Sequence, residues 1–496
     1  MPALWPCSAE DCQFPAVQRA GDCLLCGKHL CRVHLQDQWH KCARPETNWN
    51  DYSAQYAAAE ARRLGELCKS IDSTKLCARA SQVRSGEYVP CAIDLLPQKI
   101  SAMMGGQNCH AEITFEDGVV WLARFRLSSL ISPPREVRDY VLRSEAATMK
   151  FLECHTRIPS PRIFDWACES DPENTIGMGY ILMEKLHGTP LDWQAASTTQ
   201  REKVVQQLAD IMLELEKHPF DQLGSLITTA APIGDEAMPE LATVKPPIRV
   251  HGLAQHSTFH HDVSGMPPGP FLSSRVALRK LIETYLQKIA NGEIGTVENA
   301  TDVFLTHRFR LDVLDKAWEQ SATLGGSGKE TFFLKHADDK GDHILVNDDF
   351  EIVGIIDWEW CSTASKEVAF SSPCMMWPVA AFYDGSNELA QEELFLAHAF
   401  RERGRDDLAR CVLNGRKVQR LLFALGPGGA SHENKKTFAC LFMGLRRAFA
   451  CRHDTSQENR GAEEQEWEDW KANALEMWKH DDLLQAVLGS ELCVKE

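Results

Sequence analysis

The sequence predicts an α+β protein that begins with a small metal-binding module. Strand-like segments separated by turn residues are concentrated between residues 93 and 187, whereas apolar stripes with helical spacing dominate after residue 188. Strands in one part of a chain and helices in the next are typical of α+β architecture. Ahead of both regions, cysteine and histidine residues crowd into residues 7–42.

Length and charge limit the class of protein. A chain of 496 residues is long for one hydrophobic core, so we expect two or three structural units. The net charge of −17 argues against a nucleic-acid-binding surface over most of the chain, because phosphate contacts need clustered Lys and Arg. The chain has no apolar run of about 18 residues that would predict a transmembrane helix, and its first residues lack the pattern of a secretory signal. We therefore expect a cytoplasmic or nuclear protein that spans no membrane.

The start of the chain has a spacing suited to metal ligands. The eight candidate ligands are Cys7, Cys12, Cys23, Cys26, Cys31, His34, His40 and Cys42. Eight ligands suffice for two tetrahedral zinc sites, and a unit this small buries too little apolar surface to fold without such support. A disulfide framework fits less well, since the remaining cysteines are scattered along the chain. Chance clustering of thiols is the other alternative.

This spacing resembles the AN-one-type zinc finger, with no ligand missing. The resemblance implies that the ligands of the two ions interleave. One zinc ion would be held by Cys7, Cys12, Cys31 and His34, and the other by Cys23, Cys26, His40 and Cys42. His29 has no place in this pattern, so we expect it at the surface. Fingers of this type suggest contacts with a protein partner.

A helix is expected directly after the finger. Ala and Arg give good helix propensity from about Asp51 to Cys68. This helix either packs on the following domain or only spaces the finger from it.

A glycine pair precedes the first predicted hairpin. Sheet character begins near Ile93, and strands at 111–115 and 119–125 flank an Asp-Gly turn. Gly105 and Gly106 would permit close approach of the backbone to phosphates, which makes them a candidate nucleotide-covering turn. An ordinary turn would give the same pattern.

A second hairpin lies within residues 332–360. Ile344–Val346 and Ile352–Ile356 are strand-like and are separated by an acidic turn. Asp338 precedes this hairpin, and Asp357 directly follows its second strand. Two carboxylates beside one hairpin suit metal–phosphate chemistry, in which positioning dominates.

The second hairpin and its flanks resemble the catalytic segment of the aminoglycoside phosphotransferase family. The family pattern is His-x-Asp, four residues, Asn, a hydrophobic strand and Ile-Asp-Trp-Glu. The resemblance implies a bilobal protein-kinase-like fold with a small β-rich lobe, a large helical lobe and a catalytic loop at 336–359. Asp338 would accept the proton of a substrate hydroxyl, Asp357 would hold magnesium, and His336 would fix the loop backbone. The alternative is a solvated acidic loop.

The same resemblance assigns a nucleotide site in the preceding lobe. Arg124 would hold the α- and β-phosphates of ATP and pair with Glu145 on the following helix. Met183 and Glu184 would lie at the hinge that meets adenine. An exposed strand-end arginine, a solvated glutamate and a plain core strand are the alternatives.

One catalytic position departs from the family pattern. His343 stands where the family has Asn. An amide oxygen suits magnesium, whereas a neutral imidazole offers nitrogen, which suits zinc or copper better. Asp342 would be the nearest substitute oxygen ligand, and Asp339 a less favoured one.

The implied organisation has four parts: the finger at 1–45, a helical linker at 46–92, the kinase-like N-lobe at 93–187 and the helical C-lobe at 188–490. Helical stripes are expected at 204–215, 274–290, 302–320, 387–402, 434–450 and 464–487. Signatures similar to the fungal branch of the family lie at 220–226 and 269–271. Residues 227–268 between them are expected to form an irregular insertion, whose histidines (His251, His256, His260 and His261, with Asp262) form a surface loop or a metal site.

Three functions remain open from the sequence. The first is magnesium- and ATP-dependent phosphoryl transfer to a hydroxyl of a small molecule. The second is a pseudokinase that binds nucleotide weakly and serves as a scaffold. In the third, the zinc finger recognises a protein partner and the large domain is an adaptor body.

Overall fold

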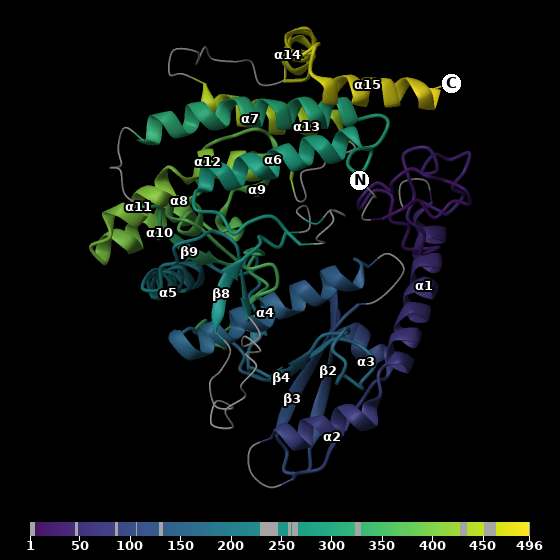
Figure 1. The fold of residues 1–496 in the computed structure, drawn as a ribbon. Coiled ribbons are helices and arrows are strands. Elements are labelled where there is room, and N and C mark those ends of the chain that lie inside the picture. The colour runs from purple at the N-terminus through teal and green to yellow at the C-terminus, as the bar shows by residue number, and fades with distance from the viewer. Residues whose placement is uncertain are drawn as a thin grey trace, which may run out of the picture.

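The computed structural model describes residues 5–44, 48–84, 88–105, 107–127, 132–228, 247–255, 259, 266–322, 329–426, 434–450 and 463–495. The predicted glycine Gly106 lies outside these residues, as do His256, His260, His261 and Asp262 of the insertion. Within them the α+β prediction is confirmed. A sheet-containing lobe is followed by a larger helical lobe, and the finger lies at one end of the long helix α1 (Trp49–Ser70) (Figure 1).

The first lobe is built on five antiparallel strands in the order β1-β2-β3-β5-β4. Their bounds are β1 Cys91–Ile93, β2 Asn108–Phe115, β3 Val120–Arg126, β4 Ile163–Ala167 and β5 Tyr180–Glu184. Successive side chains of a strand point to opposite faces. Ile113 and Ala123 therefore contribute to the core on one face, whereas Arg124 and Arg126 lie on the other face of β3.

Helices cover both faces of this sheet. Their bounds are α1 Trp49–Ser70, α2 Ser73–Val83, α3 Pro97–Ala102 and α4 Arg135–His155. Leu64 of α1 and Leu76 of α2 belong to the same buried cluster as Ile113 of β2. The segment after the finger therefore covers the sheet instead of only spacing the finger from it.

The predicted catalytic hairpin is present. β10 Ile344–Val346 pairs with β11 Ile352–Ile355, and β6 Thr189–Pro190 adds a third strand. Beside it, β9 Phe332–Lys335 pairs with β12 Ser362–Ser365. The buried side chains of this region form one core with helix α4 and with helix α5 (Thr198–Glu216).

The rest of the second lobe is mainly helical. Its helices are α5 Thr198–Glu216, α6 Ser274–Ala290, α7 Ala300–Ala322, α8 Lys366–Ala369, α9 Val379–Tyr383, α10 Gln391–Glu402, α11 Asp406–Leu413, α12 Gly415–Leu422, α13 Lys435–Phe449, α14 Glu463–Met477 and α15 Asp482–Lys495. Trp467 and Trp478 are buried in a core that α6, α7 and α13 to α15 share, so they are packing residues.

Two expectations for this lobe were wrong. The stripe at 464–487 is not one helix: the Asp481 carboxylate accepts hydrogen bonds from the amides of Leu483 and Leu484 and so begins a second helix. The segment 227–268 is not wholly irregular. Residues Ser225–Thr228 (β7) pair with Ile248–His251 (β8).

A buried cation of the finger, Arg32, makes several polar contacts with the helical lobe, beside the apolar packing of Trp5 and Ala16 against Ile227 and Ala254. The Arg32 guanidinium donates to the carbonyl oxygens of Ile289 (2.8 Å), Ile294 (2.6 Å) and Gly295 (2.9 Å). Ile289 lies in the last turn of α6, where a cation also meets the negative end of the helix dipole. The backbone amide of Gln18 also donates a hydrogen bond to the backbone carbonyl of Glu293 (2.8 Å). Among the described residues, no helix is long and apolar enough to cross a membrane.

Candidate functional site

The eight predicted metal ligands converge into two groups. The first is Cys7, Cys12, Cys31 and His34, and the second is Cys23, Cys26, His40 and Cys42. Within each group the ligand atoms all lie within 4.8 Å of one another. This is the interleaved grouping that the sequence pattern implied.

The ligand spacing fits a tetrahedral zinc ion. Zinc–sulfur bonds of about 2.3 Å and zinc–nitrogen bonds of about 2.0 Å place neighbouring ligand atoms roughly 3.5 to 3.8 Å apart. In the first group, Cys7 Sγ lies 3.5 Å from His34 Nδ1, and Cys12 Sγ lies 3.8 Å from Cys31 Sγ. In the second, Cys26 Sγ lies 3.7 Å from His40 Nε2. Both groups could therefore hold the ion that the sequence implies.

Burial and mutual repulsion disfavour the charged form of these thiols unless a cation is present. Burial and the neighbouring sulfurs raise the pKa of Cys31 and of Cys42 to about 12. Without a cation, these thiols would stay protonated at neutral pH. A metal ion stabilises the thiolate form instead.

The expectation for His29 was wrong. Its side chain is buried, and Nδ1 lies 2.7 Å from Asp22 Oδ1. The Asp22 carboxylate satisfies a polar ring that would otherwise be costly to bury. His29 is therefore a core residue of the finger.

A buried arginine joins the sheet, helix α4 and the catalytic hairpin. Arg124 Nη2 lies 3.2 Å from Glu145 Oε1 of α4, 2.9 Å from Asp357 Oδ1 and 3.4 Å from Glu359 Oε2. Arg124 and Glu145 are buried, whereas the Asp357 side chain is 47% exposed. One guanidinium therefore holds the carboxylate that follows β11 at the edge of solvent.

Two of the three carboxyl groups around Arg124 have opposite pKa shifts. Burial raises the pKa of Glu145 to about 7, although the charge of Arg124 opposes the shift. Burial would also raise the pKa of Asp357, but the charge and hydrogen bond of Arg124 outweigh it and hold that pKa below its usual value. Asp357 is therefore ionised at neutral pH, as a carboxylate ligand of a metal ion must be.

The backbone at Asp357 adopts an uncommon conformation. Its φ angle is +61°, in the left-handed region that non-glycine residues seldom occupy. Such strain persists only where the surrounding structure imposes it, and it is frequent at active sites. Here Trp358 is buried on one side of Asp357, and Arg124 holds its carboxylate on the other.

Sequence reasoning missed the partners of Glu359. This buried carboxylate forms an ion pair with Arg126 and accepts a hydrogen bond from Asn108 Nδ2 at 2.7 Å. Arg126 is two residues from Arg124 on β3, so strand alternation alone places both on one face. Asn108 is the register partner of Arg126, which only the pairing of β2 with β3 reveals.

His336 links the backbones that carry the two predicted catalytic acids. Its Nδ1 accepts the amide hydrogen of Asp338 (3.2 Å), so Nε2 carries the proton and donates to the Ile356 carbonyl (2.9 Å). Burial lowers the pKa of His336, which keeps the ring neutral. Asp338 is thereby tied to the residue before Asp357.

The Asp338 carboxylate faces solvent. Its side chain is 47% exposed and lies 3.0 Å from Lys340 Nζ. The neighbouring Asp339 has a structural role: it pairs with Lys335 (2.7 Å) and accepts the Cys374 amide (3.0 Å). Asp339 is therefore engaged in holding the loop, which leaves Asp342, an exposed residue, as the nearer alternative oxygen ligand.

His343 is buried with an unsatisfied nitrogen. Its ring stacks on His336 with centroids 4.2 Å apart, and its Nδ1 is buried without a hydrogen-bond partner among the described residues. Burial, assisted by His336, lowers the pKa of His343 to about 3, so the ring is neutral. A buried lone polar atom of this kind is costly unless a ligand or ion completes it.

The remaining predicted nucleotide residues lie on or beside the same sheet. Gly105 is exposed, and a Cβ there would meet only the Asn108 carbonyl oxygen at 3.8 Å, so a side chain would fit at this position. Met183 is buried in β5, two residues beyond Ile181, which is the register partner of Arg124. The Glu184 amide already donates to the Arg162 carbonyl (2.9 Å) within the sheet.

Part of the chain is similar to a known protein family. Residues 131–365 match the family model described as the phosphotransferase enzyme family. This range includes Glu145, β5, Asp338 and Asp357. The match covers less than half of the chain and agrees with the kinase-like fold described above, a sheet-containing lobe followed by a helical lobe.

Individual relatives cover different parts of the chain. A subtelomeric hrmA-associated cluster protein of Aspergillus fumigatus is 34% identical over 92 residues, which are 18% of this chain and 18% of that protein. The chain therefore matches about a fifth of the length of this curated relative. The ethanolamine kinase of Plasmodium vivax is 10% identical, with coverage of 86% of this chain and 89% of that one and a TM-score of 0.38. An aminoglycoside phosphotransferase in complex with GDP and kanamycin is 16% identical, with coverage of 76% and 92% and a TM-score of 0.34.

Proposed function

We propose that the chain is a two-zinc protein whose kinase-like domain transfers a phosphoryl group from ATP to a hydroxyl of a small molecule. The observation that carries the proposal is the contact of Arg124 with both Glu145 and Asp357. It joins the sheet, helix α4 and the catalytic hairpin at one point, which is the arrangement that phosphoryl transfer needs.

Three residues of the site would have separate roles in the reaction. Arg124 would turn its guanidinium toward the α- and β-phosphates, to which it can donate in a bidentate manner. Asp338, exposed in the loop, would orient the substrate hydroxyl and accept its proton. His336 would keep Asp338 in place through the two hydrogen bonds of its ring.

The donor set fits magnesium at one position. Asp357 supplies an ionised, partly exposed carboxylate, which is a hard oxygen ligand. Magnesium held there would neutralise charge on the nucleotide phosphates. His343 is a poorer donor for this ion, so Asp357 would be the principal protein ligand and water or Asp342 would complete the shell.

A screen of hydroxyl-bearing metabolites for ATP consumption tests the proposal. We expect at least one to be phosphorylated, and we expect Asp338→Ala to lower turnover by roughly 10²- to 10⁴-fold, as for loss of a general base. An Asp348→Ala variant in the exposed turn of the hairpin is the matched control. Equal turnover by the Asp338→Ala variant and the control would reject the role of Asp338.

A second candidate function is a nucleotide-binding scaffold without turnover. The observation that favours it is His343, a neutral and buried imidazole in the position of the family's metal-binding amide. In that case the zinc finger would recruit a protein partner. Nucleotide binding that is indifferent to magnesium, together with no ATP consumption in the screen, would support this function over the first.

A further inference from the structure

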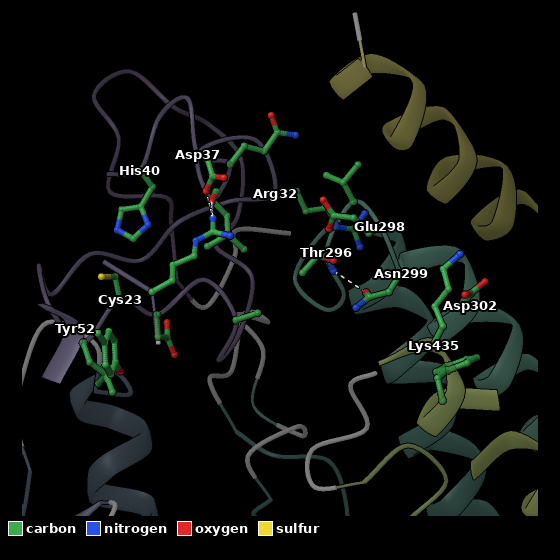
Figure 2. Close-up of a pocket in the computed structure, with 18 of the residues that line it drawn as sticks. Cys23, Arg32, Asp37, His40, Tyr52, Thr296, Glu298, Asn299, Asp302 and Lys435 are labelled. Carbon is green, nitrogen blue, oxygen red and sulfur yellow. Dashed lines mark hydrogen bonds and ion pairs between the residues drawn. The ribbon is translucent and has the colours of Figure 1, made fainter. Parts of the chain in front are cut away.

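A large groove separates the finger from the helical lobe. Its volume is about 990 Å³. Figure 2 shows one wall formed by finger residues such as Asp37 and His40 together with Tyr52 of α1, and the other formed by Glu298, Asn299 and the start of α7 and α13. The phosphotransfer site described above contributes no lining residue to this groove.

The walls of the groove are held at a fixed distance. Arg32 enters the helical lobe beside the groove and donates to three of its backbone carbonyls. The opposite wall is braced by Asn299, whose side chain accepts the Thr296 amide at 2.8 Å. The groove is therefore built by the docking of two rigid parts.

Apolar side chains line its inner surface. Leu24 and Leu35 come from the finger, and Val297 comes from the loop before α7. On the far side, Phe438 and Trp467 pack edge to face with centroids 4.8 Å apart, but each is only 3% exposed, so Leu24, Leu35 and Val297 supply most of the accessible apolar surface. A ligand for this groove would therefore bury apolar groups.

The charges at the rim are unbalanced. Asp37 is paired with Arg44, and Asp302 with Lys471. The exposed carboxylates of Glu298, Glu464 and Glu468 have no ion-pair partner among the described residues, and the exposed ammonium group of Lys435, which also lines the groove, offsets only part of their charge. The surplus of negative charge calls for a cationic occupant.

We propose that this groove binds a basic, partly apolar segment of a partner protein. Lysine or arginine side chains would meet the three rim glutamates, and the apolar side chains between them would fill the inner surface. The proposal concerns a site separate from the phosphotransfer residues, so it stands or fails independently of the phosphotransfer reaction.

The test uses the full zinc-loaded chain and a fluorescein-labelled octapeptide of alternating lysine and leucine. Fluorescence anisotropy at physiological ionic strength measures its dissociation constant. We expect the triple variant Glu298→Gln, Glu464→Gln and Glu468→Gln to bind roughly tenfold more weakly, because three partly shielded charge pairs are lost.

A charge-matched control variant removes three exposed glutamates elsewhere: Glu116→Gln, Glu173→Gln and Glu202→Gln. We expect it to bind like the wild type. Equal weakening by both variants would show only general attraction to an acidic protein and would overturn the proposal. So would absence of binding to the wild type, or equal binding of a lysine–serine octapeptide, which lacks the apolar groups.

Discussion

Replacement of Arg32 by Ala should release the finger from the helical lobe while leaving the finger folded. Arg32 makes three hydrogen bonds to backbone carbonyls of the lobe. At about 1.5 kcal/mol each, the lower figure for a bond to a charged group, they amount to about 4.5 kcal/mol. Water that enters the vacated space would restore part of this, so we expect undocking to become easier by about 3 kcal/mol.

Native-state hydrogen exchange at single amides measures this effect directly. The backbone amide of Gln18 donates to the backbone carbonyl of Glu293 across the interface between the finger and the helical lobe. Its protection from hydrogen exchange therefore reports whether the finger is docked. A loss of about 3 kcal/mol would speed its exchange by roughly 100-fold. The Leu30 amide, which donates to Gly21 within the finger, is the internal control and should keep its protection.

Two further variants sharpen the interpretation. Lys28→Ala changes an exposed cation of the finger and should leave Gln18 protected. Arg32→Lys keeps the charge but cannot reproduce the planar fork of donors, so it should be intermediate. Unchanged exchange of Gln18 in Arg32→Ala would refute the assignment of Arg32 as the docking contact.

Three other perturbations have defined outcomes. Because the pKa of Glu145 is raised to about 7 from an unfolded value near 4.5, its native state binds the extra proton, and its contribution to stability falls as pH rises from about 4.5 through 7. Between these two pH values the free energy of unfolding of the wild type should therefore fall by about 3 kcal/mol more than that of the Glu145→Gln variant. Denaturation at a series of pH values measures this, and parallel profiles for the two proteins would contradict the raised pKa of Glu145. His343→Asn should tighten magnesium–nucleotide binding several-fold by adding an oxygen ligand, whereas unchanged or weaker affinity in titration calorimetry would place His343 away from the metal. Chelation should release two zinc ions per chain and lower the midpoint of thermal unfolding. A Cys31→Ser variant should bind about one zinc ion per chain. A zinc content equal to that of the wild type would exclude Cys31 as a ligand.

The features that the sequence predicted depend on local patterns. The interleaved cysteines and histidines and the short strands around Asp357 each leave a readable spacing, and the structure brings the ligands and strands together as expected. The Arg124–Glu145 contact follows from the order strand then helix, because α4 returns over the face of β3 that bears Arg124. The catalytic roles of these residues remain predictions.

The features that were missed depend on contacts distant in the sequence. Arg32 meets carbonyls more than 250 residues away, and nothing in its neighbourhood marks it as different from a surface arginine. Glu359 needs the β2–β3 register to meet Asn108. His29 was expected at the surface because it has no place among the zinc ligands. It is buried instead, because the Asp22 carboxylate is a hydrogen-bond partner for its ring.

Titration of the chain with ATP and magnesium is the most direct test of the central claim, that the Arg124–Asp357 contact marks a nucleotide–metal site. We expect a saturable binding heat that depends on magnesium. We also expect the Asp357→Asn variant to lose the magnesium-dependent part of the binding heat. Asn is a suitable replacement because it tolerates the left-handed backbone conformation of this position. Absence of both binding heat and thermal stabilisation in the wild type would show that no nucleotide–metal site lies at the Arg124–Asp357 contact.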